Sequence, residues 1–274
     1  MFKGYSISAK GASHVTRDVV CQDHSGYARG GNYCAAAVSD GHGSERHFRS
    51  GVGAEAAVNI ALEAVKELIS NEEEFIPFME RRYQTVLKQL AGYISAKWVD
   101  EVVAHFNDNP ILETEQKAYE EYYLSDNNDS ERNITTMYGA TLIVGAITES
   151  YAFAVQIGDG ACVVEQRDGY CFIPPSTIDE RLFLGYTTSL CDANALNNFR
   201  FYYSEDIPQA IVLSTDGVVD SYSKDDFLRF NKVLCDLFVQ NYDEACANLS
   251  DWLPKLSARG SKDDMSVAGV FRTE

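Results

Sequence analysis

Acidic side chains stand where several short apolar runs stop. Asp40 follows AAAVS, Asp159 follows AFAVQIG and Asp216 follows IVLST, while Asp263 comes just before MSVAGVF. Strands of packed sheets end at common edges, so these carboxylates could converge at one place. Carboxylates brought together repel each other and are costly to remove from water. Hard divalent cations such as Mg²⁺ and Mn²⁺ prefer oxygen ligands and relieve both costs, so the pattern favours a metal site.

Plain turns are the alternative explanation of the same residues. Asp-Gly is a common turn dipeptide, so any one of these positions is explained by a turn alone. Asp23 in VVCQDHS and Asp220 in DGVVD lie in similar settings, and Lys262-Asp263-Asp264 precedes the last apolar run. Repetition after apolar runs favours the metal site, but composition and spacing leave both interpretations open.

Composition limits the class of protein. The chain has 274 residues, 45% of them hydrophobic, which is enough for one large domain or two small ones. Its net charge of −18 argues against nucleic acid or an anionic membrane as the main partner. Its seven cysteines show no zinc-site spacing. The N-terminus lacks an apolar signal core and no stretch is long enough to span a bilayer, so we expect a cytoplasmic protein.

The elements that must position the aspartates follow from periodicity. Apolar residues recur every four positions between residues 46 and 70, and again between residues 83 and 102, which predicts two helices. Short apolar runs predict strands, Asp168-Gly169 predicts a hairpin turn, and a helical pair is expected over 224–257. The order predicts a single α+β domain over 1–274, a four-layer α/β/β/α sandwich of two antiparallel sheets flanked by helix pairs.

Six motifs together resemble the metal-dependent protein phosphatase family of the protein phosphatase 2C type, and its bacterial branch in particular. They occur in the family's order: CQD at 21–23, VSDGHG at 38–43, GATLIVGAI at 139–147, VQIGDG at 155–160, LSTDGVVD at 213–220 and SKDDMSV at 261–267. Each motif is weak alone, but the ordered set is specific and covers nearly the whole chain. The resemblance implies a helical insert at about 46–130 and a flap at about 174–198.

The resemblance also implies a centre with two Mn²⁺ or Mg²⁺ ions and a weaker third. Asp40 would bridge the two ions, and Gly41 would offer its carbonyl to the second. Matching the motifs to the remaining positions gives Asp216 and Asp263 on the first ion, Asp23 and Gln22 on metal-bound waters, and Asp159, Asp220 and Asp216 again at the third ion.

The implied activity is that of a serine/threonine phosphoprotein phosphatase. A hydroxide bridging the two ions would attack phosphorus directly, without a phosphoenzyme. His42, directly after Asp40-Gly41, matches the family's general acid for the leaving alkoxide, and imidazole titrates near neutrality. A lone histidine is more often structural, and the DGHG context is what favours catalysis. His47 could pair with His42 in a zinc site, but other nitrogen or sulfur ligands are lacking, and we expect it at the surface.

Some positions depart from the family pattern. Many relatives have glutamate at Gln22, and the phosphate-binding arginine usually found four residues earlier is replaced by Asp18. Arg17 is the adjacent candidate for that role because a guanidinium suits phosphate, and His14 is another. The usual Asp-Asn pair of the last motif reads Asp263-Asp264.

Three functions compete. The first is an active phosphatase, acting as a monomer on phosphoserine and phosphothreonine proteins opposite a cognate kinase, without nucleic acid or membrane. The second is a pseudophosphatase that binds phosphoproteins without hydrolysis, which Gln22 and Asp18 favour. The third is a calcium-binding or structural acidic protein, which lacks a supporting calcium-loop motif.

Overall fold

The computed structural model describes residues 1–70, 72–124, 130–181 and 187–273. Within these residues the strands form two antiparallel five-stranded sheets. The first sheet runs in the order β1 (Phe2–Ala9), β10 (Met265–Arg272), β9 (Ala210–Ser214), β6 (Ala161–Glu165) and β7 (Cys171–Phe172). The second runs in the order β2 (His24–Arg29), β3 (Tyr33–Ser39), β4 (Leu142–Thr148), β5 (Ala152–Ile157) and β8 (Arg200–Ser204).

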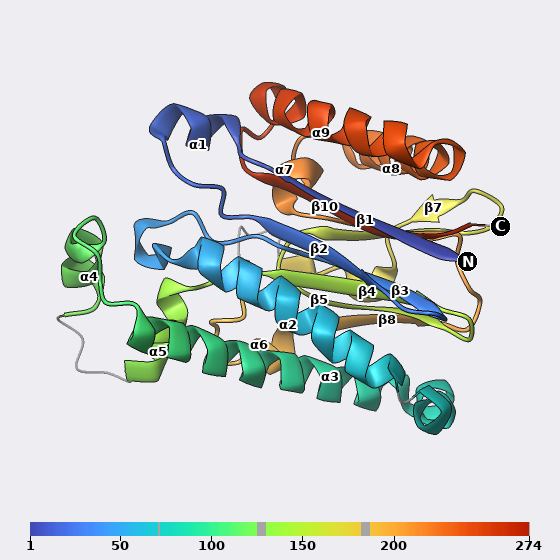
Figure 1. Cartoon of the computed structure of the whole chain (residues 1–274), viewed down its shortest axis with the longest axis horizontal. Helices are drawn as coiled ribbons and strands as arrows, with labels where there is room; N and C mark the ends of the chain where they lie inside the picture. Colours follow the sequence, from blue (N-terminus) through green and yellow to red (C-terminus); the bar gives the residue numbers. More distant parts are fainter. Residues whose placement is uncertain (71, 125–129, 182–186, 274) are drawn as a thin grey trace.

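Helix pairs cover the outer faces of the two stacked sheets (Figure 1). The pair α2 (Ser50–Ser70) and α3 (Glu72–Asp108) packs on the second sheet, and the pair α8 (Lys224–Gln240) and α9 (Tyr242–Arg259) packs on the first. The predicted α+β architecture of two antiparallel sheets with helix pairs outside is therefore confirmed.

The apolar runs of the sequence are strands buried on both faces. Along β3, Ala35 and Ala37 pack toward α2 and α3, whereas Cys34, Ala36 and Val38 pack toward the other sheet. Successive side chains of a strand point to opposite faces, so a strand between a helix layer and a second sheet is apolar at every position. The first polar residue of such a strand can occur only where the strand leaves the core. The aspartate that follows each strand therefore lies at the end of the sheet.

Some elements differ from the sequence prediction. The first long helix begins at Ser50, because residues 45–47 form a separate 3₁₀ turn. The second was expected from residue 83, and α3 does change direction there: Arg82 has φ −146° and ψ 35° inside a helix that begins at Glu72. Strand β1 and the short helix α1 (Ala12–Arg17) were not predicted at all.

Two long segments connect strands in the regions predicted as the insert and the flap. The predicted insert contains α2, α3 and α4 (Gln116–Tyr122) and is followed by α5 (Ser130–Met137). The predicted flap contains a 3₁₀ turn at Pro175–Thr177 and α6 (Ala195–Asn198), and its residues 182–186 lie outside the described residues. The boundaries of insert and flap stay predictions. Among the helices that the structure describes, none is long and apolar enough to cross a membrane.

Candidate metal centre

Three carboxylates from both sheets meet at one end of the sandwich. Asp40 follows β3, Asp159 follows β5, and Asp216 follows β9 as the first residue of α7 (Asp216–Val219). One carboxylate oxygen of each lies within 4.8 Å of the others. Because β3 and β5 belong to the second sheet and β9 to the first, the cluster lies between the two sheets, where these strands end.

The cluster lines a small polar pocket of about 170 Å³. Residues from the N-terminal segment, the Asp-Gly loops and the last motif surround it. The lining residues are His14, Gln22, Asp40, Gly41, His42, Gly43, Asp159, Thr187, Asp216, Asp263 and Asp264. The prediction placed Asp23, Asp220 and Arg17 at this centre as well, and none of the three lines the pocket.

Within the described part of the chain, the carboxylates of the cluster lack cationic partners, and they repel one another. Burial, followed by the neighbouring charges of Asp40 and Asp159, raises the pKa of Asp216 to about 9. Burial, followed by Asp23 and Asp159, also raises the pKa of Asp40 well above its usual range. None of the ion pairs among the described residues involves Asp40, Asp159 or Asp216. Unpaired carboxylates at this spacing are the environment that a bound cation relieves.

The chemistry of the donors fits Mg²⁺ or Mn²⁺. The carboxylates present only oxygen ligands, which these hard ions prefer over nitrogen or sulfur. The Oδ1 atom of Asp159 is buried without a hydrogen-bond partner, although its Oδ2 accepts a hydrogen bond from the Thr187 hydroxyl. A buried carboxylate oxygen without a donor is costly, and a metal ion would supply the missing partner.

Asp23 lies behind Asp40 and is buried. Its Oδ2 accepts a hydrogen bond of 2.7 Å from the Thr215 hydroxyl, and its carboxyl group shares a hydrogen bond with Asp40. Burial raises the pKa of Asp23 to about 8, and the neighbouring charge of Asp264 acts in the same direction. Asp23 is therefore in contact with the cluster without lining the pocket.

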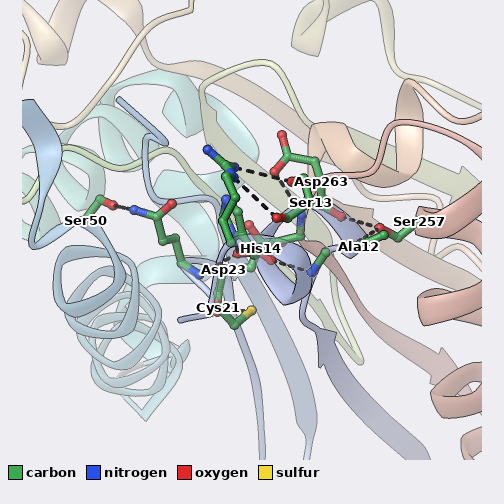
Figure 2. Close-up of polar contacts among 12 residues, drawn as sticks. Ala12, Ser13, His14, Cys21, Asp23, Ser50, Ser257 and Asp263 are labelled. Atoms are coloured by element: carbon green, nitrogen blue, oxygen red, sulfur yellow. Dashed lines mark hydrogen bonds and ion pairs between the residues drawn. The ribbon is translucent and has the colours of Figure 1, made fainter. Parts of the chain in front are cut away.

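Gly41 allows the Asp40 loop to lie against the CQD segment. A Cβ at Gly41 would come within 2.7 Å of the backbones of Gln22 and Ser50, so no side chain fits there. The Gly41 amide donates to the Gln22 carbonyl at 3.2 Å. The Gln22 side-chain amide donates to Ser50 Oγ at 2.7 Å (Figure 2), which leaves the amide oxygen available to the pocket.

His42 lines the pocket and packs beside His47, with ring centroids 4.8 Å apart. The expectation that His47 lies at the surface is wrong: the residue is half-buried, because its Nδ1 donates to the Thr136 carbonyl and its ring contacts the His42 region. Burial lowers the pKa of His47 to about 4 and also lowers that of His42. Among the described residues the two histidines do not belong to any group with metal-binding geometry, which argues against the zinc pair.

The sequence model of the protein phosphatase 2C family matches residues 10–254. The chain belongs to this family. No curated protein matches the sequence.

Solved structures of protein phosphatase 2C relatives share the fold at low identity. A serine/threonine phosphatase of S. agalactiae is 16% identical over 100% of both chains, with a TM-score of 0.56. The catalytic domain of the serine/threonine protein phosphatase PstP, solved with two manganese ions, is 15% identical over 100% of this chain and 99% of that chain, with a TM-score of 0.53. RsbX, solved with magnesium, is 10% identical over 98% of this chain and 94% of that chain, with a TM-score of 0.51.

Three residues that the protein phosphatase 2C resemblance assigned lie at the margin of the pocket or outside it. Asp263 lines the pocket but is exposed, and its Oδ1 accepts a hydrogen bond from the amide of Asp264. Asp220 is exposed at the end of α7, where burial, then Asp159 and Asp263, raise its pKa. Arg17 ends α1, and its guanidinium donates to the carbonyl and hydroxyl of Ser13 at 3.3 and 3.4 Å.

The pocket wall also contains Gly43, Thr187 and Asp264, which the site prediction left out, and His14, which the sequence offered only as an alternative candidate for binding phosphate. For His14 and Asp264 the sequence carried a signal, because each stands close to a position where the family pattern changes. Thr187 sits in a segment of little periodicity, and no local pattern connects it with Asp159, 28 positions earlier.

Proposed function

We propose that this protein phosphatase 2C relative is an active, Mn²⁺- or Mg²⁺-dependent phosphatase of phosphoserine and phosphothreonine proteins. The observation that carries the proposal is the triad of Asp40, Asp159 and Asp216, whose oxygens lie within 4.8 Å of one another and which form no ion pair with another described residue. A purely structural role would give such carboxylates arginine or lysine partners, since buried unpaired charges are destabilising.

Different residues of the pocket would hold different ions. Asp40, Asp216, Asp263 and the Gly41 carbonyl would hold two ions, with Asp23 and Gln22 orienting the waters. Asp159 and Asp220 would hold a weaker third. Two structural relatives carry manganese or magnesium, which supports this choice of metals. When bound, such ions lower the pKa of water and offset negative charge on phosphoryl oxygens.

His42 would act as the general acid in this proposal. The leaving serine or threonine oxygen needs a proton when its bond to phosphorus breaks, and His42 lines the pocket directly beside the Asp40 loop. Burial lowers the pKa of His42, which makes its protonated form a stronger acid. The half-buried ring of His47 packs against it and limits its rotation.

The partners follow from the proposed reaction. A phosphatase of this class acts opposite a kinase, and the net charge of −18 disfavours nucleic acid and anionic membranes. We propose a monomeric, cytoplasmic enzyme.

Hydrolysis of para-nitrophenyl phosphate and of a phosphothreonine peptide tests the proposal. Wild type should turn over with Mn²⁺ or Mg²⁺ and stop in EDTA, and Asp216→Asn should lose at least about a hundredfold in rate. Asp251→Asn, at an exposed position on α9, is the matched control and should keep full activity. Folded wild-type protein without turnover in either metal would contradict the enzyme and favour a phosphoprotein-binding pseudophosphatase.

A further inference from the structure

A buried histidine and a buried carboxylate form a pair in the wall of the metal pocket. His14 is 5% exposed and Asp264 is 3% exposed, and both line the pocket. The Nδ1 atom of His14 lies 2.9 Å from Oδ2 of Asp264. The two residues are 250 positions apart, so the pair forms only when α1 docks beside the start of β10.

The other contacts of Asp264 fix its role as an acceptor. The amide of Gly11 donates to its Oδ1 and the amide of Gln22 donates to its Oδ2, both at 2.6 Å. An ionised carboxylate is an acceptor at both oxygens, so a carboxylate with three donors leaves the Nδ1 proton on His14. Asp264 therefore sets the tautomer and orientation of the ring.

The remaining ring nitrogen of His14 is available to a ligand. Among the described residues, none hydrogen-bonds to Nε2 of His14, while the residue lines the pocket together with the carboxylate cluster. The start of α1 is held in place, since the Ala12 amide donates to Ser257 Oγ at 2.9 Å. Figure 2 shows His14 in the same cluster as Asp23 and Asp263, next to the contact between Ala12 and Ser257.

Arg17, the sequence candidate for binding phosphate, has a different environment. It is the last residue of α1, and Asp18 ends the helix in the left-handed conformation with φ 56°. The Arg17 side chain is exposed and turns back onto Ser13 of its own helix. A pocket ligand would therefore meet His14 before it met Arg17.

We propose that His14, oriented by Asp264, contacts the phosphoryl oxygens of the substrate and of product phosphate in the metal pocket. The proposal rests on the proposed phosphatase function and deepens it. When both ring nitrogens carry a proton, Nδ1–H donates to Asp264 and Nε2–H donates to a phosphoryl oxygen. In this proposal His14 takes the role of the arginine that Asp18 replaces. Asp264 is then the residue that holds the His14 ring in place.

Affinity for inorganic phosphate tests the contact directly. Phosphate is titrated into Mg²⁺-saturated protein and followed by ³¹P NMR, and the KM for para-nitrophenyl phosphate is measured in parallel. His14→Gln should weaken phosphate binding and raise KM by about tenfold, the effect of one charge-assisted hydrogen bond. Mg²⁺ affinity, measured by calorimetry, should stay within about twofold of wild type because His14 is not a metal ligand here. His24→Gln, a histidine outside the pocket, is the matched control.

Each outcome decides the proposal. Weaker phosphate binding in Arg17→Ala together with unchanged binding in His14→Gln would overturn it in favour of the arginine. Wild type that binds Mg²⁺ but no phosphate would overturn it as well. Wild type that binds phosphate but hydrolyses neither substrate would contradict only the proposed function, and the His14→Gln titration would still decide the contact.

Asp264 is the positioning residue of the pair, and its contribution is separable from folding. The single variant Asp264→Asn should bind phosphate more weakly than wild type. The double variant Asp264→Asn/His14→Gln should bind phosphate no more weakly than His14→Gln, because the two residues act as a unit. Fully additive losses in phosphate affinity would contradict positioning. If Asp264→Asn does not fold, His14→Gln and Arg17→Ala still decide the contact.

Discussion

Asp179 and the carboxylates of the metal pocket have opposite electrostatic environments in this molecule. Asp179 accepts hydrogen bonds from Arg181 and Arg200, and the bonds from Arg181 lead the causes that lower its pKa to about 2. At the metal pocket, burial and like charges raise the pKa of Asp216 to about 9. The same side-chain type is thus held ionised in one region and held protonated in the other.

Arg200 makes the contrast sharper because it lies near both environments. Its guanidinium donates to the Gly158 carbonyl, one residue from Asp159, yet its ion pair is with Asp179. A counter-charge is therefore at hand, but the pocket carboxylates are left without it. Paired carboxylates stabilise the fold in this molecule, whereas unpaired ones cost stability, and the proposed binding of cations would account for that cost.

The largest effect should come from breaking a buried pair outside the pocket. Arg49 donates to both oxygens of Glu115 and to the carbonyls of Asn109 and Pro110, fastening the end of α3 to the start of α2. Arg49→Met should lower the free energy of unfolding by about 3–5 kcal/mol, because the largely buried Glu115 carboxylate loses its cationic partner and two carbonyls lose this donor. Urea unfolding measures the change.

An exposed pair supplies the comparison for Arg49. Lys255 pairs with Asp251 on the surface of α9, with side chains 62% and 72% exposed. Lys255→Met should leave the urea midpoint unchanged, since exposed pairs contribute little. Equal losses in the free energy of unfolding for Arg49→Met and Lys255→Met would contradict the claim that burial makes the Arg49 pair more stabilising.

The unpaired group should give the metal-free protein an inverted pH dependence. Asp216 and Asp23 have pKa values of about 9 and about 8 in the native state, against an ordinary value of 3.8. Between these values the native state holds protons that the unfolded state has released, so stability falls as pH rises. In EDTA, the free energy of unfolding should decrease between about pH 5 and about pH 8. Asp179 acts in the opposite sense, and its stabilisation is lost only as pH falls toward about 2.

Two further samples sharpen the pH measurement. Asp216→Asn should flatten the slope, because the amide has no proton to lose. Saturating Mn²⁺ should raise stability most at high pH, since the ions bind the deprotonated carboxylates. An unchanged slope in Asp216→Asn would show that the pocket carboxylates do not cause it.

The smallest effect is expected from a substitution of Thr187, which hydrogen-bonds to Asp159 of the metal pocket. Its hydroxyl donates to Oδ2 of Asp159, so Thr187→Val should weaken Mn²⁺ binding by about tenfold with little effect on stability. Calorimetry measures the affinity, and Thr85→Val at an exposed position of α3 is the control. Equal Mn²⁺ affinities in both variants would remove Thr187 from the metal centre.

The sequence was informative where apolar runs end and weak where distant segments meet. Asp40, Asp159 and Asp216 could be predicted together because each follows a strand buried on both faces, and such strands end at a common edge. Strand β1 was missed because glycine and serines interrupt its apolar residues, and α1 because six residues carry no helical period. The His14 and Asp264 pair could not be predicted from spacing, since it depends on how α1 docks against β10.

Strand β1 occupies the edge of its sheet, where its only strand partner among the described residues is β10, from Phe2 opposite Arg272 to Ala9 opposite Met265. During synthesis the ribosome makes β1 long before β10, and every other strand of both sheets is made between them. The same delay applies to Asp263 and Asp264, which directly precede β10. The nascent chain therefore cannot complete the carboxylate pocket until β10 has been made, and a chain truncated before β10 should expose an unpaired strand to chaperones.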